Sequence, residues 1–430
     1  MLFIQLVRPP KKFHPFPFEY HQELEVTIDS LTNLGIGVAR TILPEAVEIE
    51  TLPGEESAER RWVIFVPFSL PGERVRIRIY RNDNNCSQAD LLSVIEPSPE
   101  RIEPSCPLFG ECGGCQYQHL SYETQLLWKQ RQVGELAQRM AGLELEVLPP
   151  VPSPRQWGYR SKLTPHFQKP RNEKDSVGPI GFLAQGTRSR LIDVPQCPIA
   201  MDSINEALPT VRSETHARAN SFKKGGTLLL RAHPKGVETN HRAVISEKVN
   251  DLRFHFLAGD FFQNNPFILP HFVDYVAKEA SETGNRHLVD AYCGSGLFTL
   301  SLARYFDQVA GVEVSDSSAD FARRNAELND LPHVKILTAS AEEIFRDIAF
   351  PPEDTTVVID PPRKGCTEGF LTQLNTFQPS RLIYISCNPA TQMRDFQQLS
   401  ESGYQVEKLQ PFDLFPQTRH LECVATLTRA

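Results

Sequence analysis

The feature that most constrains the fold is a strand, a glycine turn and a helix in residues 287–304. The apolar strand ends in Asp290, Gly-Ser-Gly follows at residues 294–296, and helical spacing begins at Leu297. Residues 251–430 repeat this alternation of apolar strands and helices, which is typical of a parallel sheet covered by helices. We therefore predict a doubly wound α/β domain over residues 251–430.

The glycine turn also indicates a ligand site. In doubly wound sheets ligands lie at the carboxyl ends of the strands, where glycine lets the backbone approach them. The turn has G-x-G rather than the full G-x-G-x-x-G, so a dinucleotide is less suitable. The next strand ends in Glu313, whose carboxylate can accept hydrogen bonds from both ribose hydroxyls. This favours a class I (Rossmann-like) site for S-adenosylmethionine (AdoMet), with an unrelated α/β fold as the alternative.

Two further strand ends carry reactive groups. Asp360 begins Asp-Pro-Pro-Arg, which by itself permits a methyltransferase acting on planar amines, and Cys387 stands in Ser-Cys-Asn-Pro at the end of the next strand. Amine methylation needs no thiol. Methylation at C5 of a pyrimidine does, because a thiolate must add to C6 before C5 can attack the methyl donor. Cys387 alone could be a small buried hydrophobe, but its position favours a nucleophile.

A reaction at C5 also requires a base for the departing proton. Glu422 is the candidate, because its apolar neighbours predict partial burial and burial raises the pKa of a carboxylate toward the working range. The alternative is a structural carboxylate paired with Arg419 or His420. Gln263, in Phe-Phe-Gln-Asn-Asn, could bind the amino-acid end of AdoMet or simply mark the start of a helix.

Four of the nine cysteines have the spacing of a metal or cluster site. Cys106, Cys112 and Cys115 form C-x5-C-x2-C, and Cys197 follows far downstream in Pro-Gln-Cys-Pro. Four thiolates can hold zinc or an iron–sulfur cluster. Zinc usually takes paired C-x2-C knuckles and only one is present, so the spacing favours iron–sulfur. Buried cysteines without a ligand are the alternative.

The amino-terminal half is predicted to contain two further regions. Residues 17–98 have short strands with Gly and Pro turns, as in a small β-barrel, after an extension at residues 1–16. On one strand Arg74, Arg76 and Arg78 share a face, which suits phosphate binding or the protection of an edge strand. Residues 99–250 are predicted to be a mixed α+β region that includes a helix at 122–140.

The distribution of charge is compatible with a nucleic-acid enzyme. The formal net charge is −8, which argues weakly against general nucleic-acid binding. Residues 152–190 nevertheless hold eight Lys or Arg against two acidic residues, a local sum of +6. A local basic surface is enough to collect phosphates, although an ordinary solvated face is an equal alternative.

Taken together, these motifs resemble the RNA uracil-5-methyltransferases, and the resemblance covers most of the chain. It implies that Cys387 is the nucleophile and Glu422 the base. It assigns the AdoMet contacts to Gln263, Tyr292, Glu313 and Asp360. It also implies that the barrel is an OB-like, RNA-binding TRAM domain and that Cys106, Cys112, Cys115 and Cys197 hold a [4Fe–4S] cluster, as in the ribosomal-RNA branch. Leu297 and Ser340 depart from the Asn that some members have at these positions.

The expected reaction is transfer of a methyl group from AdoMet to C5 of a uridine in RNA. The barrel and the cysteines favour 23S ribosomal RNA. Transfer RNA is the alternative, followed by a catalytically silent RNA-binding protein and then by cytosine-5 methylation. No apolar run reaches the roughly 18 residues of a membrane span, and the first residues are a poor secretory signal. We therefore expect a cytoplasmic monomer without a membrane partner.

Overall fold

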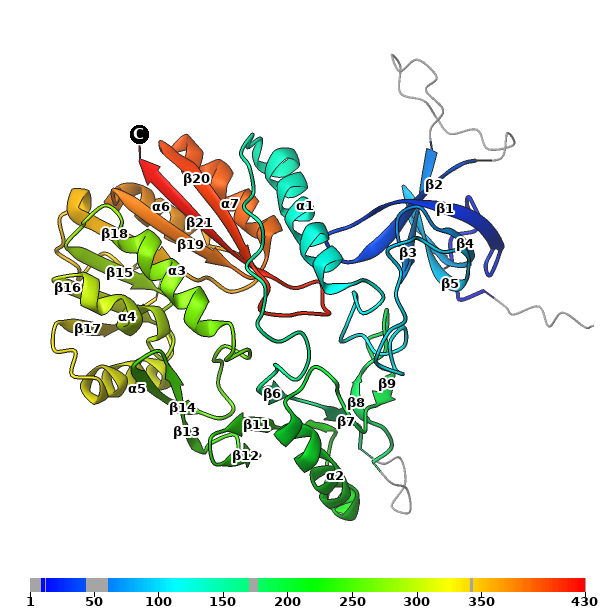
Figure 1. Cartoon of the computed structure of the whole chain (residues 1–430), viewed down its shortest axis with the longest axis horizontal. Coiled ribbons are helices and arrows are strands. Elements are labelled where there is room, and N and C mark those ends of the chain that lie inside the picture. Colours follow the sequence, from blue (N-terminus) through cyan, green and yellow to red (C-terminus); the bar gives the residue numbers. More distant parts are fainter. Residues whose placement is uncertain (1–8, 12, 44–60, 170–176, 341–342, 430) are drawn as a thin grey trace, which may run out of the picture. The chain divides into compact units, whose positions relative to one another are not determined.

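The computed structural model describes residues 9–11, 13–43, 61–169, 177–340 and 343–429 (Figure 1). The chain divides into two compact units. Unit 1 comprises Met1–Gly110 and Cys115–Thr124, and unit 2 comprises Glu111–Gly114 and Gln125–Ala430. Within the described residues, no helix has the length and apolarity that a membrane crossing needs.

Unit 1 contains the predicted barrel. Its five strands close in the order β1-β2-β3-β5-β4, and every neighbouring pair is antiparallel except β3 with β5. The strands are β1 (Glu23–Leu31), β2 (Ile36–Ile42), β3 (Arg61–Pro67), β4 (Arg74–Asn82) and β5 (Cys86–Glu96). Alternate apolar side chains such as Ile64, Ile77 and Ile79 are fully buried inside.

The predicted extension lies partly outside the described residues, since residues 1–8 and 12 are not described. Its last part contacts the barrel. Asn82 donates side-chain hydrogen bonds to the carbonyls of His14 (2.8 Å) and Phe18 (2.7 Å), and Phe16 packs edge-on against Trp62. The segment from His14 therefore packs with the strands that follow it.

The arginine face of β4 is not a free cationic surface. Neighbouring strands place carboxylates beside all three guanidinium groups. The ion pairs are Arg74 with Glu25 (2.9 Å) and Glu96 (2.7 Å), Arg76 with Glu25 (3.2 Å), and Arg78 with Asp90 (3.0 Å). The barrel is closed, so protection of an open edge is not their role either. Exposed pairs of this kind contribute little stability, and they largely cancel the charge that phosphate binding would use.

Unit 2 is built on a seven-stranded sheet with the order β17-β16-β15-β18-β19-β21-β20. Its strands are β15 (His287–Ala291), β16 (Gln308–Glu313), β17 (Val334–Thr338), β18 (Thr355–Ile359), β19 (Arg381–Ser386), β20 (Tyr404–Phe412) and β21 (Glu422–Arg429). The first five are parallel, and β21 is antiparallel to both of its neighbours. The predicted doubly wound domain is confirmed.

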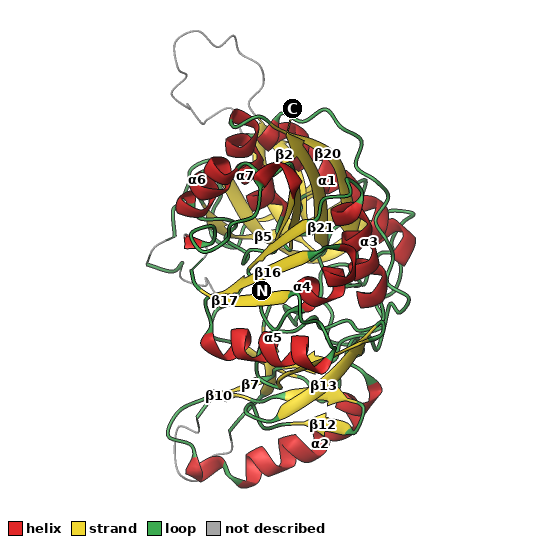
Figure 2. Cartoon of the chain, turned by 90° about the vertical axis from the view of Figure 1, so that its left-hand side faces the viewer, coloured by secondary structure: helices red, strands yellow, loops and turns green. Residues whose placement is uncertain are grey.

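Helices cover both faces of this sheet (Figure 2). Their bounds are α1 (Tyr122–Ala141), α3 (Leu269–Ser281), α4 (Leu297–Leu302), α5 (Asp316–Leu328), α6 (Glu368–Phe377) and α7 (Pro389–Glu401), with short 3-10 turns η2 (Ala303–Tyr305) and η4 (Pro352–Asp354). Strand β19 shows the two-sided burial. Ile383 and Ile385 face the cluster that contains α3 and α4, whereas Leu382 and Tyr384 face the cluster that contains α1, α6 and α7. Such continuous apolar strands are typical of a parallel sheet buried on both faces.

The rest of unit 2 holds much of the α+β region predicted for residues 99–250, although residues 99–110 and 115–124 belong to unit 1. It contains a four-stranded sheet (β10-β7-β8-β9), a three-stranded sheet (β12-β11-β6) and a hairpin (β13-β14). The elements are β6 (Lys162–Leu163), β7 (His166–Phe167), β8 (Ile180–Leu183), β9 (Leu191–Asp193), α2 (Asp202–Ala217), η1 (Ala219–Ser221), β10 (Gly226–Thr227), β11 (Leu230–His233), β12 (Gly236–Glu238), β13 (Val244–Val249) and β14 (Leu252–Leu257).

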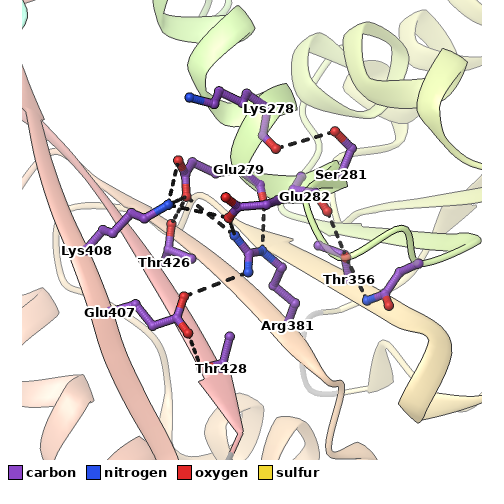
Figure 3. Close-up of polar contacts among 12 residues, drawn as sticks. Lys278, Glu279, Ser281, Glu282, Thr356, Arg381, Glu407, Lys408, Thr426 and Thr428 are labelled. Carbon is purple, nitrogen blue, oxygen red and sulfur yellow. Dashed lines mark hydrogen bonds and ion pairs between the residues drawn. The ribbon is translucent and has the colours of Figure 1, made fainter.

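A charge network around the buried pair Arg381 and Glu279 joins α3 to the carboxy-terminal strands where β19 begins (Figure 3). Arg381 is 3% exposed and donates to the carbonyl of Glu279 (2.6 Å) and to the carboxylate of Glu282 (2.6 Å). The Glu279 carboxylate accepts from Arg381 (3.5 Å), from Lys408 (3.1 Å) and from the hydroxyl of Thr426 (2.9 Å). The network fixes the amino end of β19, whose carboxyl end carries Cys387.

Candidate active site

The sheet brings most of the predicted site residues to one of its ends, the edge formed by the carboxyl ends of the parallel strands. Parallel strands end at the same edge, and these ends carry Tyr292 after β15, Glu313 on β16, Asp360 after β18 and Cys387 after β19. Antiparallel β21 begins at that edge with Glu422. Ser386, the last residue of β19, pairs with Cys423 of β21, and the charge of Glu422 acts on the Cys387 thiol.

The Cys387 thiol is half-buried among charged groups. Burial, followed by the charges of Glu422 and Asp360, raises the pKa of Cys387 to about 12, and Arg363 opposes this rise. The thiol is therefore the favoured form in the protein alone. Arg363 belongs to the quoted Asp-Pro-Pro-Arg motif but was not assigned a role from the sequence. Its position beside the thiol makes it the group that favours the reactive thiolate.

The Glu422 carboxyl group is more buried than predicted. It is 4% exposed, and this burial, with the charge of Asp360, raises its pKa well above the usual range. Arg363 again opposes the rise. Asp360 is half-buried, and its desolvation together with the charge of Asp290 raises the pKa of Asp360 to about 7. The edge is thus a cluster of carboxyl groups with raised pKa values and one guanidinium that favours the ionised forms.

The loop before β21 is held in place by hydrogen bonds and so fixes the position of Glu422, the first residue of that strand. Lys129 of α1 donates to the Asp413 carboxylate (2.7 Å) and to the His420 carbonyl (3.0 Å), and both Lys129 and Asp413 are fully buried. The His420 ring lies 3.5 Å from the Arg363 guanidinium through Nδ1. Burial and neighbouring cations, Arg363 foremost, lower the pKa of His420 to about 3, which keeps the ring neutral.

Two buried acceptor oxygens, one in the loop before α3 and one on β15, fit a cationic ligand. Gln263 is 4% exposed and Asp290 is 1% exposed. Among the described residues, the Oε1 atom of Gln263 and the Oδ1 atom of Asp290 have no hydrogen-bond partner, while Asp290 Oδ2 accepts from the Thr299 hydroxyl (2.5 Å). Buried polar atoms are normally paired, so these acceptors suit the ammonium group and positive charge of AdoMet. The sequence placed Asp290 at a strand end without assigning it a contact.

The glycine turn and the end of β16 are joined through Glu313. Its carboxylate accepts from the backbone N–H groups of Gly294 (3.0 Å) and Ser315 (2.8 Å), and its oxygens keep lone pairs for ribose hydroxyls. Tyr292 has a left-handed backbone with φ of 65°, a strained conformation that often marks functional turns. Leu297 packs into the apolar core, so it makes no polar contact of the kind that Asn would make.

The four predicted cluster cysteines are divided between the units, with Cys106 and Cys115 in unit 1 and Cys112 and Cys197 in unit 2. The second pair lies close enough for Cys112 to raise the pKa of Cys197, although burial is the larger cause. Within the described part of the chain, no three Cys, His, Asp or Glu side chains form a group able to hold a metal ion. The structure therefore does not confirm the predicted cluster.

Several cations of the basic segment have partners inside unit 2. Lys162 donates to the carbonyls of Gly259 (2.7 Å) and Asp260 (2.9 Å), and burial lowers its pKa to about 8. Lys162 thereby anchors the loop that leads to Gln263. The Arg155 guanidinium lies 4.0 Å from the centre of the Phe267 ring. Arg171 and Lys174 lie outside the described residues.

Comparisons with known proteins identify the family. The family model described as tRNA (uracil-5-)-methyltransferase matches residues 201–430. The tRNA (uracil(54)-C(5))-methyltransferase of Schizosaccharomyces pombe is 40% identical, with 96% of this chain and 79% of the relative aligned. This chain belongs to the RNA uracil-5-methyltransferase family. It is therefore an AdoMet-dependent RNA methyltransferase.

Further matches agree with this membership. The Saccharomyces cerevisiae protein of the same name as the S. pombe enzyme is 33% identical, covering 96% of this chain and 75% of the relative. An RNA methyltransferase of Halalkalibacterium halodurans is 30% identical over 96% of this chain and 98% of the relative. The crystal structure of Pyrococcus abyssi tRNA (uracil-54, C5)-methyltransferase with S-adenosyl-L-homocysteine has a TM-score of 0.68 at 23% identity, covering 94% of this chain and 100% of that one. This likeness confirms the fold.

Proposed function

We propose that this methyltransferase modifies C5 of a uridine in transfer RNA through a covalent adduct between Cys387 and C6 of the base. The observation that carries the proposal is that the Cys387 thiol, directly after β19, lies among the charges of Glu422, Asp360 and Arg363 at the carboxyl edge of the sheet. The sequence alone favoured ribosomal RNA, because of the barrel and the cysteines. Two relatives named as tRNA (uracil(54)-C(5))-methyltransferases, at 40% and 33% identity, now favour transfer RNA.

The chemistry assigns one task to each reactive side chain. The Cys387 sulfur bonds to C6, and the ring electrons move to O4 as an enolate. Carbon 5 then attacks the AdoMet methyl group, whose bond to sulfur breaks. The Glu422 carboxylate removes the C5 proton, and the resulting electron pair re-forms the C5–C6 double bond and expels the thiolate. Arg363 lowers the pKa of both Cys387 and Glu422, so its charge supports both reactive forms.

The neighbouring groups would hold AdoMet and RNA. Gln263 and Asp360 would meet the amino-acid end and the charged centre of AdoMet, while Tyr292 and Glu313 would hold the nucleoside. The target base has to leave its stack to reach this edge. The barrel of residues 17–98 and the region of residues 99–250 would bind the surrounding RNA, using surfaces other than the paired arginine face of β4. A cytoplasmic location and a monomeric state stay predictions.

We also propose that the four cysteines hold a [4Fe–4S] cluster. The support comes from Cys197, whose half-buried sulfur accepts backbone N–H groups of Ile199 and Ala200. Hydrogen bonds of this kind are typical of cluster thiolates. Such a cluster would be structural, since the methyl transfer moves no electron. Anaerobic purification should yield iron and sulfide with visible absorbance, whereas one zinc per chain and no iron would contradict the proposal.

The test of function is methyl transfer to defined RNAs. The protein is incubated with AdoMet labelled in its methyl group and with unmodified transcripts of transfer RNA and of 23S ribosomal RNA. We expect 5-methyluridine in transfer RNA and none with Cys387→Ala. Modification of ribosomal RNA alone would instead support the alternative substrate. Absence of transfer to any RNA would support a silent RNA-binding protein, and transfer by Cys387→Ala would refute the nucleophile.

A further inference from the structure

The loop that carries Arg363 has no regular secondary structure and is held by helix α7. Three of its carbonyl oxygens accept side-chain hydrogen bonds from this helix and its cap. The carbonyl of Arg363 accepts from Asn388 (3.1 Å) and Thr391 (3.3 Å), and the carbonyls of Lys364 (3.0 Å) and Cys366 (3.4 Å) accept from Arg394. Because α7 begins two residues after Cys387, these bonds tie the guanidinium-bearing loop to the element next to the thiol.

A single buried carboxylate connects this loop to the helix and the sheet. Asp395 is 1% exposed. Its Oδ2 atom accepts from the Cys366 N–H (2.8 Å) and the Tyr384 hydroxyl (2.6 Å), and its Oδ1 atom accepts from Arg394 (2.6 Å). Tyr384 lies on β19, so one side chain joins three elements. Hydrogen bonds to a buried charge are among the stronger ones in proteins.

The packing at Gly365 shows how closely the loop approaches this carboxylate. Gly365 has φ of +79°, and a Cβ atom there would come within 2.8 Å of the Asp395 carboxylate and 2.5 Å of Arg394. Any larger residue would have to displace these groups. The loop thus packs closely against α7 at Gly365, two residues after Arg363.

We propose that Asp395 is a positioning residue for methyl transfer, because it seats the loop that keeps the Arg363 guanidinium beside the Cys387 thiol. This inference rests on the proposed function of Cys387. Asp395 acts through Arg363, so its removal should mimic a partial loss of that guanidinium. Arg363 lowers the pKa of Cys387, and a displaced Arg363 should therefore move thiol reactivity to higher pH.

The test follows adduct formation between Cys387 and transfer RNA that contains 5-fluorouridine, from about pH 6 to about pH 9. With Asp395→Asn, adduct formation near neutral pH should be on the order of 100-fold slower, as expected for a misplaced catalytic group. Because burial holds the pKa of Cys387 at about 12, the rate should climb with pH over this whole range; the pH needed to reach a given rate should be higher in the variant, and AdoMet affinity should stay unchanged. Tyr384→Phe removes one donor without a change of shape and should slow adduct formation by about tenfold. It provides the same readout if Asp395→Asn does not fold.

Two controls separate positioning from general stability. Leu399→Ala removes a buried side chain from the same helix, so it should lower stability without changing the pH at which adduct formation reaches a given rate. In an Arg363→Gln background, Asp395→Asn should add no further shift, because both changes act on one interaction. An unchanged dependence of the rate on pH in Asp395→Asn, an equal shift in Leu399→Ala, or additive shifts would overturn the inference. Failure of the wild-type protein to form the adduct would instead refute the proposed function.

Discussion

Replacement of Lys129 by Met tests how the loop before Glu422 is held. The Lys129 ammonium and the Asp413 carboxylate are both fully buried and 2.7 Å apart. Removal of the cation leaves a buried carboxylate whose Oδ2 atom already has no partner among the described residues, and it also removes the bond to the His420 carbonyl. Breaking a buried pair in this way costs about 3–5 kcal/mol. We expect a loss of that size in the free energy of unfolding.

Urea denaturation followed by tryptophan fluorescence measures this loss, since Trp128 and Trp157 both belong to unit 2. Arg131→Met is the matched control on the same helix, because Arg131 is exposed and its pair with Glu135 should contribute less than about 1 kcal/mol. Adding Asp413→Asn to Lys129→Met should recover part of the stability by removing the unpaired charge. A loss below about 1 kcal/mol, or one equal to that of Arg131→Met, would refute the reasoning.

Three further predictions concern the site and its support. Glu422→Gln should form the Cys387 adduct and accumulate it in methylated form on ordinary transfer RNA, visible as a slower band on a denaturing gel; normal turnover would exclude Glu422 as the base. AdoMet affinity measured by equilibrium dialysis should rise as pH increases through about 7, because burial raises the pKa of Asp290 and Asp360 to about 7 and their ionised forms attract the cation; a flat profile would argue against those contacts. Arg381→Met should lower stability by about 3 kcal/mol, because it leaves Glu279 short of a buried partner, while AdoMet affinity should stay at the wild-type value; a loss of affinity would show that the network reaches the site.

The sequence predicted the sheet and the gathering of Cys387, Glu313 and Asp360 because parallel strands end at one edge, so position along the chain determines position in space. It could not predict the partners of Arg74, Arg76 and Arg78, because the matching carboxylates lie on other barrel strands. The same limit applies to Asp395. Its contact with the backbone N–H of Cys366, 29 residues away, depends on how α7 packs and has no local pattern.

The ionisation and pairing of the charged residues were harder to predict from the sequence than their positions in the fold. The apolar neighbours of Glu422 predicted partial burial, but the pKa of this carboxyl group also depends on Asp360 and Arg363, which arrive from another strand end. The sequence likewise predicted the net charge of the basic segment, residues 152–190, but not the role of its individual cations. Lys162 proved to be an anchor for the loop before Gln263, because its ammonium group reaches two backbone carbonyls of that loop.

The most direct test of the account identifies the residue that becomes covalently attached to 5-fluorouridine. The C5 fluorine of this base cannot leave as a proton, so the adduct persists. Transfer RNA containing 5-fluorouridine is incubated with AdoMet and the protein, and the cross-linked peptide is sequenced by mass spectrometry. We predict a methylated fluorouridine attached to the sulfur of Cys387. Attachment at another residue, or an unchanged yield of adduct in Cys387→Ala, would contradict the central claim.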